Sequence, residues 1–414
     1  MTERNIIAGI DIGCSGVRCV IAVQEDNSLL EIAGVGIASC SGHIRHGVLV
    51  NASIAGDAIR KAVEEAEQTC GLEIESAFVN ITGLHVRGIL ASATSQVGEG
   101  RSEDLEEITE DDIRKVIESA GNITLPSGCE VLERIVRDYS FGGFSQLPDP
   151  PVGLKAVSVQ ARVYTIYADR IAAENLRTVL QNAGIAVEAV IPSAVASAVA
   201  VLNSDEKQVG TVVVDIGSAN TDLVVYYGGA PIHLSSFAMG GDKITSDIQS
   251  LGISWNDAEK LKTEKVAAIN QFAEKNTLSV RKVGGRGTVS VALPVLTQIA
   301  AQRIEEIFNF AAEEISASGI GLASLTGGVV ITGGAARMTG IIEAASSITG
   351  HQVEPGSPRA VKSDSKLANT PEMATAIGLV KHGLELRQKD TGGKERASCK
   401  DIMNKVSKFL NKLQ

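Results

Sequence analysis

Two stretches of this sequence, IIAGIDIGCSGVRCVIAV at Ile6–Val23 and TVVVDIGSANTDLVVYY at Thr211–Tyr227, follow the same plan. In each, a β-branched run leads into Asp-Ile-Gly and a few small residues, and a second apolar run follows. This pattern is typical of a β-hairpin with a glycine-rich tip. The aspartates Asp11 and Asp215 hold matching places in the two copies. An internal repeat of this kind predicts two pseudo-symmetric halves that face one another.

Length and composition indicate the number of domains, the kind of core and the functions that are not expected. A chain of 414 residues is long for one core and predicts two or more domains. Hydrophobic residues make up 44% and aromatic residues 3%, so we expect an aliphatic core. A net charge of −11 argues against a nucleic-acid-binding body. The six cysteines form no C-x-x-C pair, so reduced cytoplasmic thiols are expected rather than a metal site or disulfide framework.

Membrane-spanning and targeting segments are not expected. The first residues lack the basic and apolar regions of a signal peptide. No run reaches the roughly 18 apolar residues that a spanning helix needs. Any membrane contact is therefore expected from outside the bilayer core.

Strands and helices alternate along the chain, which predicts an α/β fold. The expected helices are Ile54–Cys70, Thr109–Gly121, Asp169–Gly184, Pro192–Leu202, Asn256–Ala273 and Ala292–Ser318. A polar link at Asn203–Gln208 is expected to join the two halves. Near the end of the second half, a strand at Gly328–Thr332 is expected to run into Gly-Gly and then a helix.

The same pattern gives a division into domains. We expect a small α/β insertion at 84–162 because the pattern changes there and a turn-rich, proline-containing link lies within it. It separates two parts of the first half, 1–83 and 163–202. The second half is expected at 203–339, with a return to the first half at 340–384. A linker at 385–398 and a terminal helix at 399–414 complete the division.

Both hairpin tips are candidate phosphate-binding loops. Backbone N–H groups at a glycine-rich tip approach phosphate oxygens closely, and a carboxylate before the tip holds Mg²⁺ through water. The phosphate-binding candidates are Gly13, Cys14, Ser15, Gly217, Ser218 and Ala219, and the Mg²⁺ candidates are Asp11 and Asp215. A single Asp-Ile-Gly after a strand is equally well explained as a plain turn. Two copies in matching contexts favour the phosphate site.

Two further segments are candidates for the adenosine side of a nucleotide site. Gly333, Gly334 and Ala335 follow the late buried strand, where backbone groups lie open to a ligand. Glu259 and Lys262 are three residues apart on one helix face. Alone, the first is a common turn and the second a solvated helix face. Together with the two tips, they predict an adenosine pocket.

The C-terminal segment is expected to bind a membrane surface. From Arg396 onward, five basic residues against Asp401 give a net charge of +4. The apolar residues fall on one face of a helix, and lysines lie beside them. These membrane-binding candidates are Ile402, Met403, Lys405, Val406, Lys408, Phe409, Leu410, Lys412 and Leu413. A basic amphipathic helix is typical of attachment to anionic lipid. The alternative is a helix that docks on the protein's own surface.

These features in this order resemble the ATPase domain shared by actin, sugar kinases and heat-shock chaperones. Within that superfamily the chain is similar to FtsA over nearly its whole length. The segments that carry this resemblance are Gly47–Glu67, ITEDDIRKVIESA at Ile108–Ala120, DPPVGL at Asp149–Leu154, GGDKITSDI at Gly240–Ile248, DAEKLK, VGGR at Val283–Arg286 and TGGAA. The insertion also sits where FtsA carries its characteristic subdomain.

The resemblance implies an actin-like fold with ATP and Mg²⁺ between the halves. It also implies a cell-division protein that forms actin-like filaments and captures the C-terminal tail of FtsZ. Such a protein attaches to the inner face of the cytoplasmic membrane at the division site, where other division proteins are expected as partners. The alternatives are a shape-determining or pilus-assembly relative, or a sugar-kinase-like enzyme. A sugar kinase needs a catalytic base beside its substrate and has no use for a basic amphipathic tail.

Three departures from the family pattern bear on hydrolysis. FtsA usually reads D-I-G-T-S-K where this chain has Asp11-Ile-Gly-Cys-Ser-Gly16. It usually reads D-I-G-G-G-T-T-D where this chain has Asp215-Ile-Gly-Ser-Ala-Asn-Thr-Asp222. Ile191 stands where several relatives in the superfamily have an acidic residue. Backbone donors remain for nucleotide binding, but no base for water is evident. At most a slow ATPase is expected.

Overall fold

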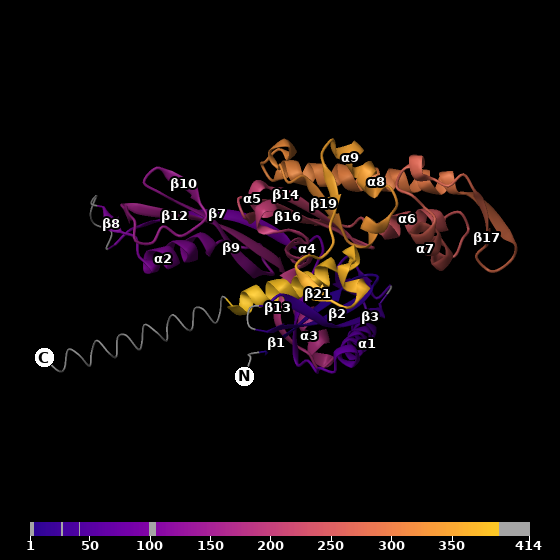
Figure 1. The fold of residues 1–414 in the computed structure, drawn as a ribbon, viewed down its shortest axis with the longest axis horizontal. Coiled ribbons are helices and arrows are strands. Elements are labelled where there is room, and N and C mark those ends of the chain that lie inside the picture. The colour runs from indigo at the N-terminus through magenta and orange to yellow at the C-terminus, as the bar shows by residue number, and fades with distance from the viewer. Residues whose placement is uncertain (1–3, 26–27, 41, 99–104, 389–414) are drawn as a thin grey trace.

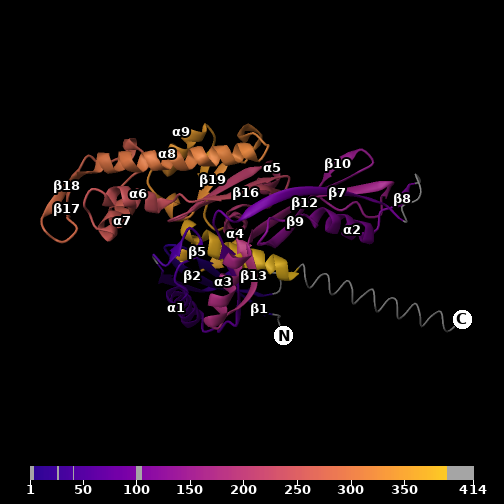
Figure 2. The ribbon, with the colours of Figure 1, turned by 180° about the vertical axis from the view of Figure 1, so that it is seen from behind.

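A computed structural model describes the chain except for residues 1–3, 26–27, 41, 99–104 and 389–414. Two halves lie one above the other in Figure 1, and the insertion extends from them to one side. The hairpin β17–β18 (Thr277–Arg281 and Thr288–Ala292) lies at the opposite end of the molecule. Figure 2 shows the same arrangement from behind.

The first half is built on a six-stranded sheet in the order β13-β6-β1-β2-β3-β21. The strands β1, β2 and β3 form an antiparallel meander, and β6 and β13 add to β1 in parallel. Their bounds are β1 Arg4–Ile12, β2 Gly16–Glu25, β3 Leu30–Ser39, β6 Ser76–Ile81, β13 Ala186–Pro192 and β21 Val361–Ser363. Two short strands, β4 (Ile44–Arg45) and β5 (Val48–Leu49), form a small hairpin after β3.

The second half repeats this topology. Its five-stranded sheet has the order β16-β15-β14-β19-β20, with an antiparallel meander followed by two parallel strands. The bounds are β14 Thr211–Ile216, β15 Thr221–Tyr227, β16 Ala230–Phe237, β19 Val329–Thr332 and β20 Val353–Pro355. The two Asp-Ile-Gly hairpins, β1–β2 and β14–β15, hold equivalent places in the two sheets. The internal repeat and the two halves predicted from the sequence are confirmed.

Helices of the first half pack closely on its sheet. The helix α1 (Ala52–Cys70) begins after the N-cap Asn51 and ends at Gly71, whose backbone is left-handed. A Cβ atom at Gly36 of β3 would collide with the carbonyl of Ala62, so glycine allows α1 to lie directly on the strand. The remaining helices are α3 (Arg170–Asn182), α4 (Ser193–Val201) and residues 374–388. Every residue of α4 is buried, and the helix contacts strands of both sheets.

Three expectations about the second half need correction. The Asn203–Gln208 link contains a short helix, α5 (Ser204–Val209), because Asn203 and Glu206 form a capping box. The helix expected at Asn256–Ala273 ends early, as α7 (Trp255–Glu264), and a short 3₁₀ turn follows at Asn270–Phe272. After Glu264 the chain turns so that residues 266–268 are buried in the core. Gly333 is followed by the 3₁₀ turn Gly334–Arg337 instead of an α-helix, since α9 (Ile341–Thr349) begins only later.

The other helices of this half match the sequence more closely. The long helix α8 (Leu293–Ala317) lies within one residue of its expected bounds at either end. The helix α6 (Gly241–Gln249) follows β16 and packs against α7 and α8.

The insertion has its own sheet and its own apolar cluster. Its strands pair in the order β10-β9-β12-β7, and α2 (Glu110–Gly121) packs against β7 and β12. The strand bounds are β7 Arg87–Gln96, β9 Cys129–Phe141, β10 Phe144–Leu147 and β12 Ser158–Asp169. A small second pairing joins β8 (Glu106–Glu107) to β11 (Lys155–Ala156). The predicted capping box between Thr109 and Asp112 is present. β12 continues past residue 162 to Asp169, and the chain enters α3 from there.

The C-terminal part of the chain is described only as far as residue 388. The helix 374–388 continues into the stretch where we expected the linker to begin. The segment 399–414, with its nine membrane-binding candidates, lies outside the described residues. In the part of the chain that the structure describes, no helix is long and apolar enough to cross a membrane.

Candidate nucleotide site

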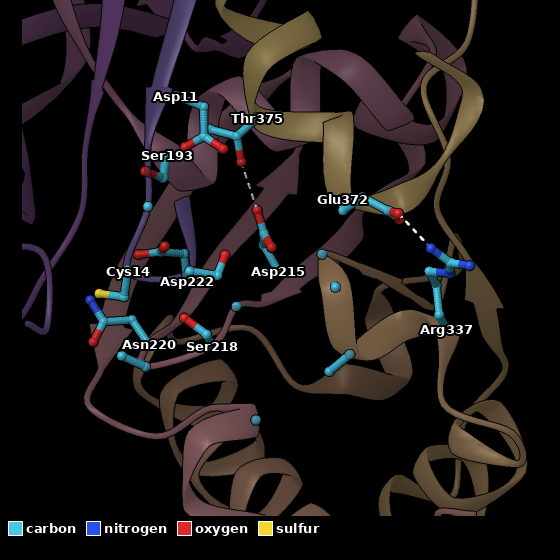
Figure 3. Close-up of a pocket in the computed structure, with 18 of the residues that line it drawn as sticks. Asp11, Cys14, Ser193, Asp215, Ser218, Asn220, Asp222, Arg337, Glu372 and Thr375 are labelled. Carbon is cyan, nitrogen blue, oxygen red and sulfur yellow. Dashed lines mark hydrogen bonds and ion pairs between the residues drawn. The ribbon is translucent and has the colours of Figure 1, made fainter. Parts of the chain in front are cut away.

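A cavity of about 570 Å³ lies between the two halves. All of the expected phosphate, Mg²⁺ and adenosine candidates line it: Asp11, Gly13, Cys14, Ser15, Asp215, Gly217, Ser218, Ala219, Glu259, Lys262, Gly333, Gly334 and Ala335. Figure 3 shows Asp11 and Asp215 entering it from separate strands, with Cys14 and Ser218 nearby. Residues more than 300 positions apart are thereby brought into one site.

The first tip is a tight turn between β1 and β2. The N–H of Gly13 donates to the carbonyl of Gly16 at 3.0 Å, and the N–H of Gly16 donates back to Gly13 at 3.2 Å. Asp11 lies opposite Arg18 in the strand register, and the two side chains form an ion pair at 3.3 Å. Asn80, at the end of β6, donates its amide to the other carboxylate oxygen at 2.9 Å. Asp11 is thus held on both sides and fixed at the cavity wall.

The second tip is built in the same way. The N–H of Gly217 donates to the carbonyl of Asn220 at 2.9 Å, and the backbone N–H of Asp242 in α6 donates to the carbonyl of Ser218 at 2.7 Å. Asp215 accepts from Ser197 of α4 at 2.5 Å and from Thr375 at 3.1 Å. Around the tips, no hydrogen bond within the described part of the chain uses the N–H groups of Ser218 or Ala219. These donors remain for a ligand.

Glycine is needed where the third segment passes the second tip. A Cβ atom at Gly333 would collide with the carboxylate of Asp215, and its φ of +84° lies in the left-handed region that favours glycine. The backbone after β19 therefore closes the cavity at this point. No local pattern places Gly333 beside Asp215, because the contact arises from the parallel pairing of β14 with β19, in which Asp215 faces Thr332.

Three aspartates, Asp11, Asp215 and Asp222, line this cavity together, and Arg18 forms an ion pair with the first of them. Burial raises the pKa of Asp11 to about 6, although Arg18 lowers it and Asp215 raises it further. Burial, with a contribution from Asp215, raises the pKa of Asp222 to about 7. Burial likewise raises the pKa of Asp215. Buried carboxylates of like charge disfavour ionisation, and a divalent cation among them would reverse that effect. The donor set fits Mg²⁺, which prefers oxygen ligands and keeps its waters.

The side of the cavity that we expected to hold adenosine is more closed than the sequence suggested. Lys262 is buried and donates to Gly241 at 3.2 Å, Thr245 at 2.9 Å and Glu259 at 2.7 Å. Its three N–H groups are therefore matched by protein acceptors. Glu259 also accepts from Thr245. Both residues line the cavity but are tied to each other, so they form its wall and hold α6 against α7.

Sequence reasoning missed several lining residues, which are Arg18, Asn80, Ser193, Asn220, Asp222, Arg337, Glu372 and Thr375 among others. Arg18 could have been predicted from the sequence. The hairpin register that aligns Ile12 with Val17 also aligns Asp11 with Arg18. Arg337 and Glu372 form an ion pair at 2.7 Å beside the cavity, as Figure 3 shows. Their positions follow from the tertiary fold, and no local pattern marks them.

Solved structures with the same fold define the class. The chain superposes on a PilM–PilN type IV pilus biogenesis complex with a TM-score of 0.62 at 16% identity, covering 91% of this chain and 98% of that one. It also superposes on MreB 5 of Spiroplasma citri bound to AMPPNP with a TM-score of 0.53 at 12% identity, covering 94% of this chain and 99% of that one. With its two repeated sheets facing one cavity, the protein has the fold of the actin-like ATPases, as the sequence predicted.

Sequence comparison narrows the class to one family. The family model described as cell division protein FtsA matches residues 212–378, and the model of the SHS2 domain inserted in FtsA matches residues 83–167. FtsA of Neisseria meningitidis is 33% identical over 91% of this chain and 90% of its own length. FtsA of Pseudomonas aeruginosa is 30% identical over 92% of this chain and 89% of its own. The chain belongs to the FtsA family of cell-division proteins.

Proposed function

We propose that this protein binds Mg·ATP in the cavity between its halves and tethers the FtsZ ring to the inner face of the cytoplasmic membrane. The observation that carries the nucleotide part is the meeting of two Asp-Ile-Gly tips at one cavity with the buried Asp11 and Asp215 and the half-buried Asp222. A cavity of about 570 Å³ is within the size range of small-molecule sites. A protein of the same fold, MreB 5 of Spiroplasma citri, is bound to AMPPNP.

Each lining group has a role in this proposal. The N–H groups of Ser218 and Ala219 hold phosphate oxygens from the second-half side, and the Gly13-Cys14-Ser15 tip does so from the first. Asp11 and Asp215 hold Mg²⁺ through water, and that ion offsets the charge on the β- and γ-phosphates. The backbone of Gly333–Ala335 lies against the nucleoside.

Slow hydrolysis is part of the proposal. Asp11 accepts from Arg18 and Asn80, and Asp215 accepts from Ser197 and Thr375 through one oxygen. Both carboxylates are therefore positioned for the water shell of Mg²⁺, and neither is assigned to the attacking water. Efficient turnover needs a residue that orients the attacking water. ATP then acts mainly as a structural ligand that sets the relation between the two halves and so controls self-assembly.

Membrane and partner binding rest on family membership and on the C-terminal sequence. FtsA of Borreliella burgdorferi aligns over 99% of this chain and 98% of its own length, so the alignment reaches into the C-terminal segment. Residues 399–414 supply the amphipathic anchor, and filament formation multiplies the anchors to make attachment firm. The FtsZ tail is expected on the second half. Localisation follows as peripheral, on the inner membrane face at the division site.

Recruitment of FtsZ to vesicles tests the adaptor role. Fluorescent FtsZ is floated with vesicles containing anionic lipid, in the presence of ATP and the full chain. We expect FtsZ in the vesicle fraction with the wild-type protein, and FtsZ left behind when its C-terminal tail is removed. If FtsZ does not float with the wild-type protein while that protein itself floats, the FtsZ-tether function is wrong. If neither floats, the membrane anchor is wrong.

A further inference from the structure

A second cavity, of about 400 Å³, lies where the insertion meets the second half. It shares no lining residue with the nucleotide cavity. The insertion contributes residues of β9 and β10, and the second half contributes α5, the turn after β15 and the segment 324–326. Neither the sequence motifs nor the proposed nucleotide function accounts for this site.

A β-bulge directs Arg137 toward this cavity. In the pairing of β12 with β9, Arg162 faces Asp138 and Val163 faces Val136, so Arg137 is the extra residue on β9. A bulge of this kind bends the strand and re-aims a side chain. As a result, Arg137 and Asp138 both line the cavity although they are consecutive in the strand.

The charges at the cavity do not balance. Arg162 donates to both oxygens of Asp138, at 2.7 and 2.5 Å, so the charge of that carboxylate is already paired with one guanidinium. Arg137 has only a longer ion pair with Asp138, at 3.6 Å, and its side chain is 13% exposed. Within the described residues, the terminal nitrogens of Arg137 donate no hydrogen bond. Burial and the neighbouring Arg162 lower the pKa of Arg137, yet a guanidinium stays charged at neutral pH. Two guanidinium groups thus share one carboxylate.

Neutral polar groups complete the walls. Tyr227 of the second half lies near enough to Arg137 to interact with it electrostatically. Gln208 and Thr326 also belong to the second half, and Gln146 belongs to β10. Gln146 has a φ of +59°, a left-handed conformation that is rare for residues other than glycine and that surrounding structure must impose. Hydroxyl and amide groups around an arginine whose positive charge is only partly balanced can bind an oxyanion.

We propose that this cavity binds a small ligand through a phosphate or carboxylate group held by Arg137. The planar guanidinium presents parallel N–H groups that match either oxyanion. A cavity of this volume is in the range of small-molecule sites. Because its walls come from the insertion and from the second half, one bound ligand contacts both and holds them together.

The test uses the full chain labelled with 3-fluorotyrosine, in which ¹⁹F NMR resolves the five tyrosines. The Tyr227 resonance is assigned with Tyr227→Phe. Inorganic phosphate is titrated in one arm and succinate in the other, with chloride at the same ionic strength as the reference. We expect a saturable shift of Tyr227 with at least one of the two anions, beyond the chloride reference. The arm that responds identifies phosphate or carboxylate as the ligand chemistry.

Variants separate this site from the nucleotide cavity. Arg137→Gln is expected to weaken the anion's affinity at least tenfold, whereas Arg114→Gln on exposed α2 removes the same charge and is expected to leave it unchanged. Ser324 is exposed at the cavity, so Ser324→Glu is expected to weaken binding and Ser324→Lys to strengthen it without disturbing the core. The proposal is overturned if Tyr227 gives no saturable shift with either anion. It is also overturned if folded Arg137→Gln, or the Ser324 pair, binds with wild-type affinity.

Discussion

The hydroxyl of Thr82, just after β6 in the first half, lies 2.7 and 2.8 Å from the two carboxylate oxygens of Asp222 on β15 in the second half. This hydrogen bond joins the halves beside the nucleotide cavity. A second link lies nearby, where His46 meets Asn220 at 3.2 Å. The halves are therefore tied by short polar contacts next to the place where a nucleotide would bind. Any change in the charge of Asp222 acts on that junction.

Asp222→Asn is expected to make the ligand-free protein more stable relative to wild type as pH rises. The pKa of Asp222 in the folded protein is about 7, above its ordinary 3.8, chiefly because of burial and then Asp215. Stability from such a group is present below its unfolded pKa and is lost as pH rises through about 7. The asparagine variant does not pay that cost. We expect the difference in unfolding free energy to grow by roughly 1–3 kcal/mol between pH 5 and pH 8.

Urea unfolding of the two proteins at both pH values, without nucleotide or Mg²⁺, measures this difference. Asp57→Asn on the exposed face of α1 is the matched control and should show no such growth. An Asp222→Asn difference that is equal at pH 5 and pH 8 would contradict the assignment of a raised pKa to this carboxylate.

Glu133→Gln is expected to destabilise the protein at pH 7 and to matter less at pH 10. His382 is buried, and its Nε2 and Nδ1 atoms lie 3.0 Å from Glu133 and 3.2 Å from Glu385. Burial alone would lower the pKa of His382, but the two glutamates outweigh it and raise the pKa to about 9. A raised histidine pKa stabilises the fold below its unfolded value of about 6.5, and that stability is lost as pH rises through about 9.

The expected cost of Glu133→Gln at pH 7 is roughly 1–3 kcal/mol, measured by chemical unfolding. Because Glu133 belongs to β9 and His382 to the helix 374–388, the loss should loosen the insertion from the first half. Glu118→Gln on exposed α2 controls for the removed charge. Equal costs at pH 7 and pH 10 would show that the pair does not act through a charged histidine.

Local sequence patterns predicted most of the strands and helices. The elements and site residues that were not predicted have physical causes. Asp11 and Asp215 were predictable because each hairpin is a local unit with its own turn signal. The end of α7 was not, because Val266 and Ala268 continue an apolar spacing that looks helical but is buried in the core by a turn. Asn80 and Thr375 reach the cavity from elements distant in sequence. The positions of both residues depend on how α4 packs against the two sheets. No short stretch of the sequence indicates that packing.

Restoring glycine at the second tip tests the account of the phosphate loops. In Ser218→Gly/Ala219→Gly, the backbone loses two Cβ atoms that stand near the expected phosphate, so ATP should bind several-fold more tightly.

Wild-type turnover is expected below about 1 per second, because no residue is committed to orienting water. A coupled phosphate-release assay measures the rate. Wild-type protein that hydrolyses tens of ATP per second without a partner would overturn this expectation.

Phe409→Glu is expected to release the protein from anionic vesicles while leaving ATP binding intact. Partial burial of each apolar side chain contributes less than the 1.5–3 kcal/mol of full burial, and each lysine adds roughly 1 kcal/mol on an anionic surface. These gains must cover the ordering of a short helix, so a single charge on the apolar face suffices for release. Raising salt should weaken wild-type binding as well.

The matched control for the tail is Asn404→Glu, which at 100° per residue falls on the opposite face of the expected helix. It adds the same charge and is expected to lower vesicle co-sedimentation only slightly. If deletion of residues 399–414 leaves co-sedimentation unchanged, the tail is not the membrane anchor.

Binding of Mg·ATP by the cavity between the halves is tested most directly by calorimetry on four proteins: wild type, Asp11→Asn, Asp215→Asn and Asp57→Asn. We expect Mg-dependent ATP binding that weakens at least tenfold, or roughly 1.4 kcal/mol, in Asp215→Asn and stays within twofold in Asp57→Asn. Omitting Mg²⁺ should reduce the difference between Asp215→Asn and wild type. ATP affinity that is unchanged in both Asp215→Asn and Asp11→Asn would contradict the placement of the nucleotide.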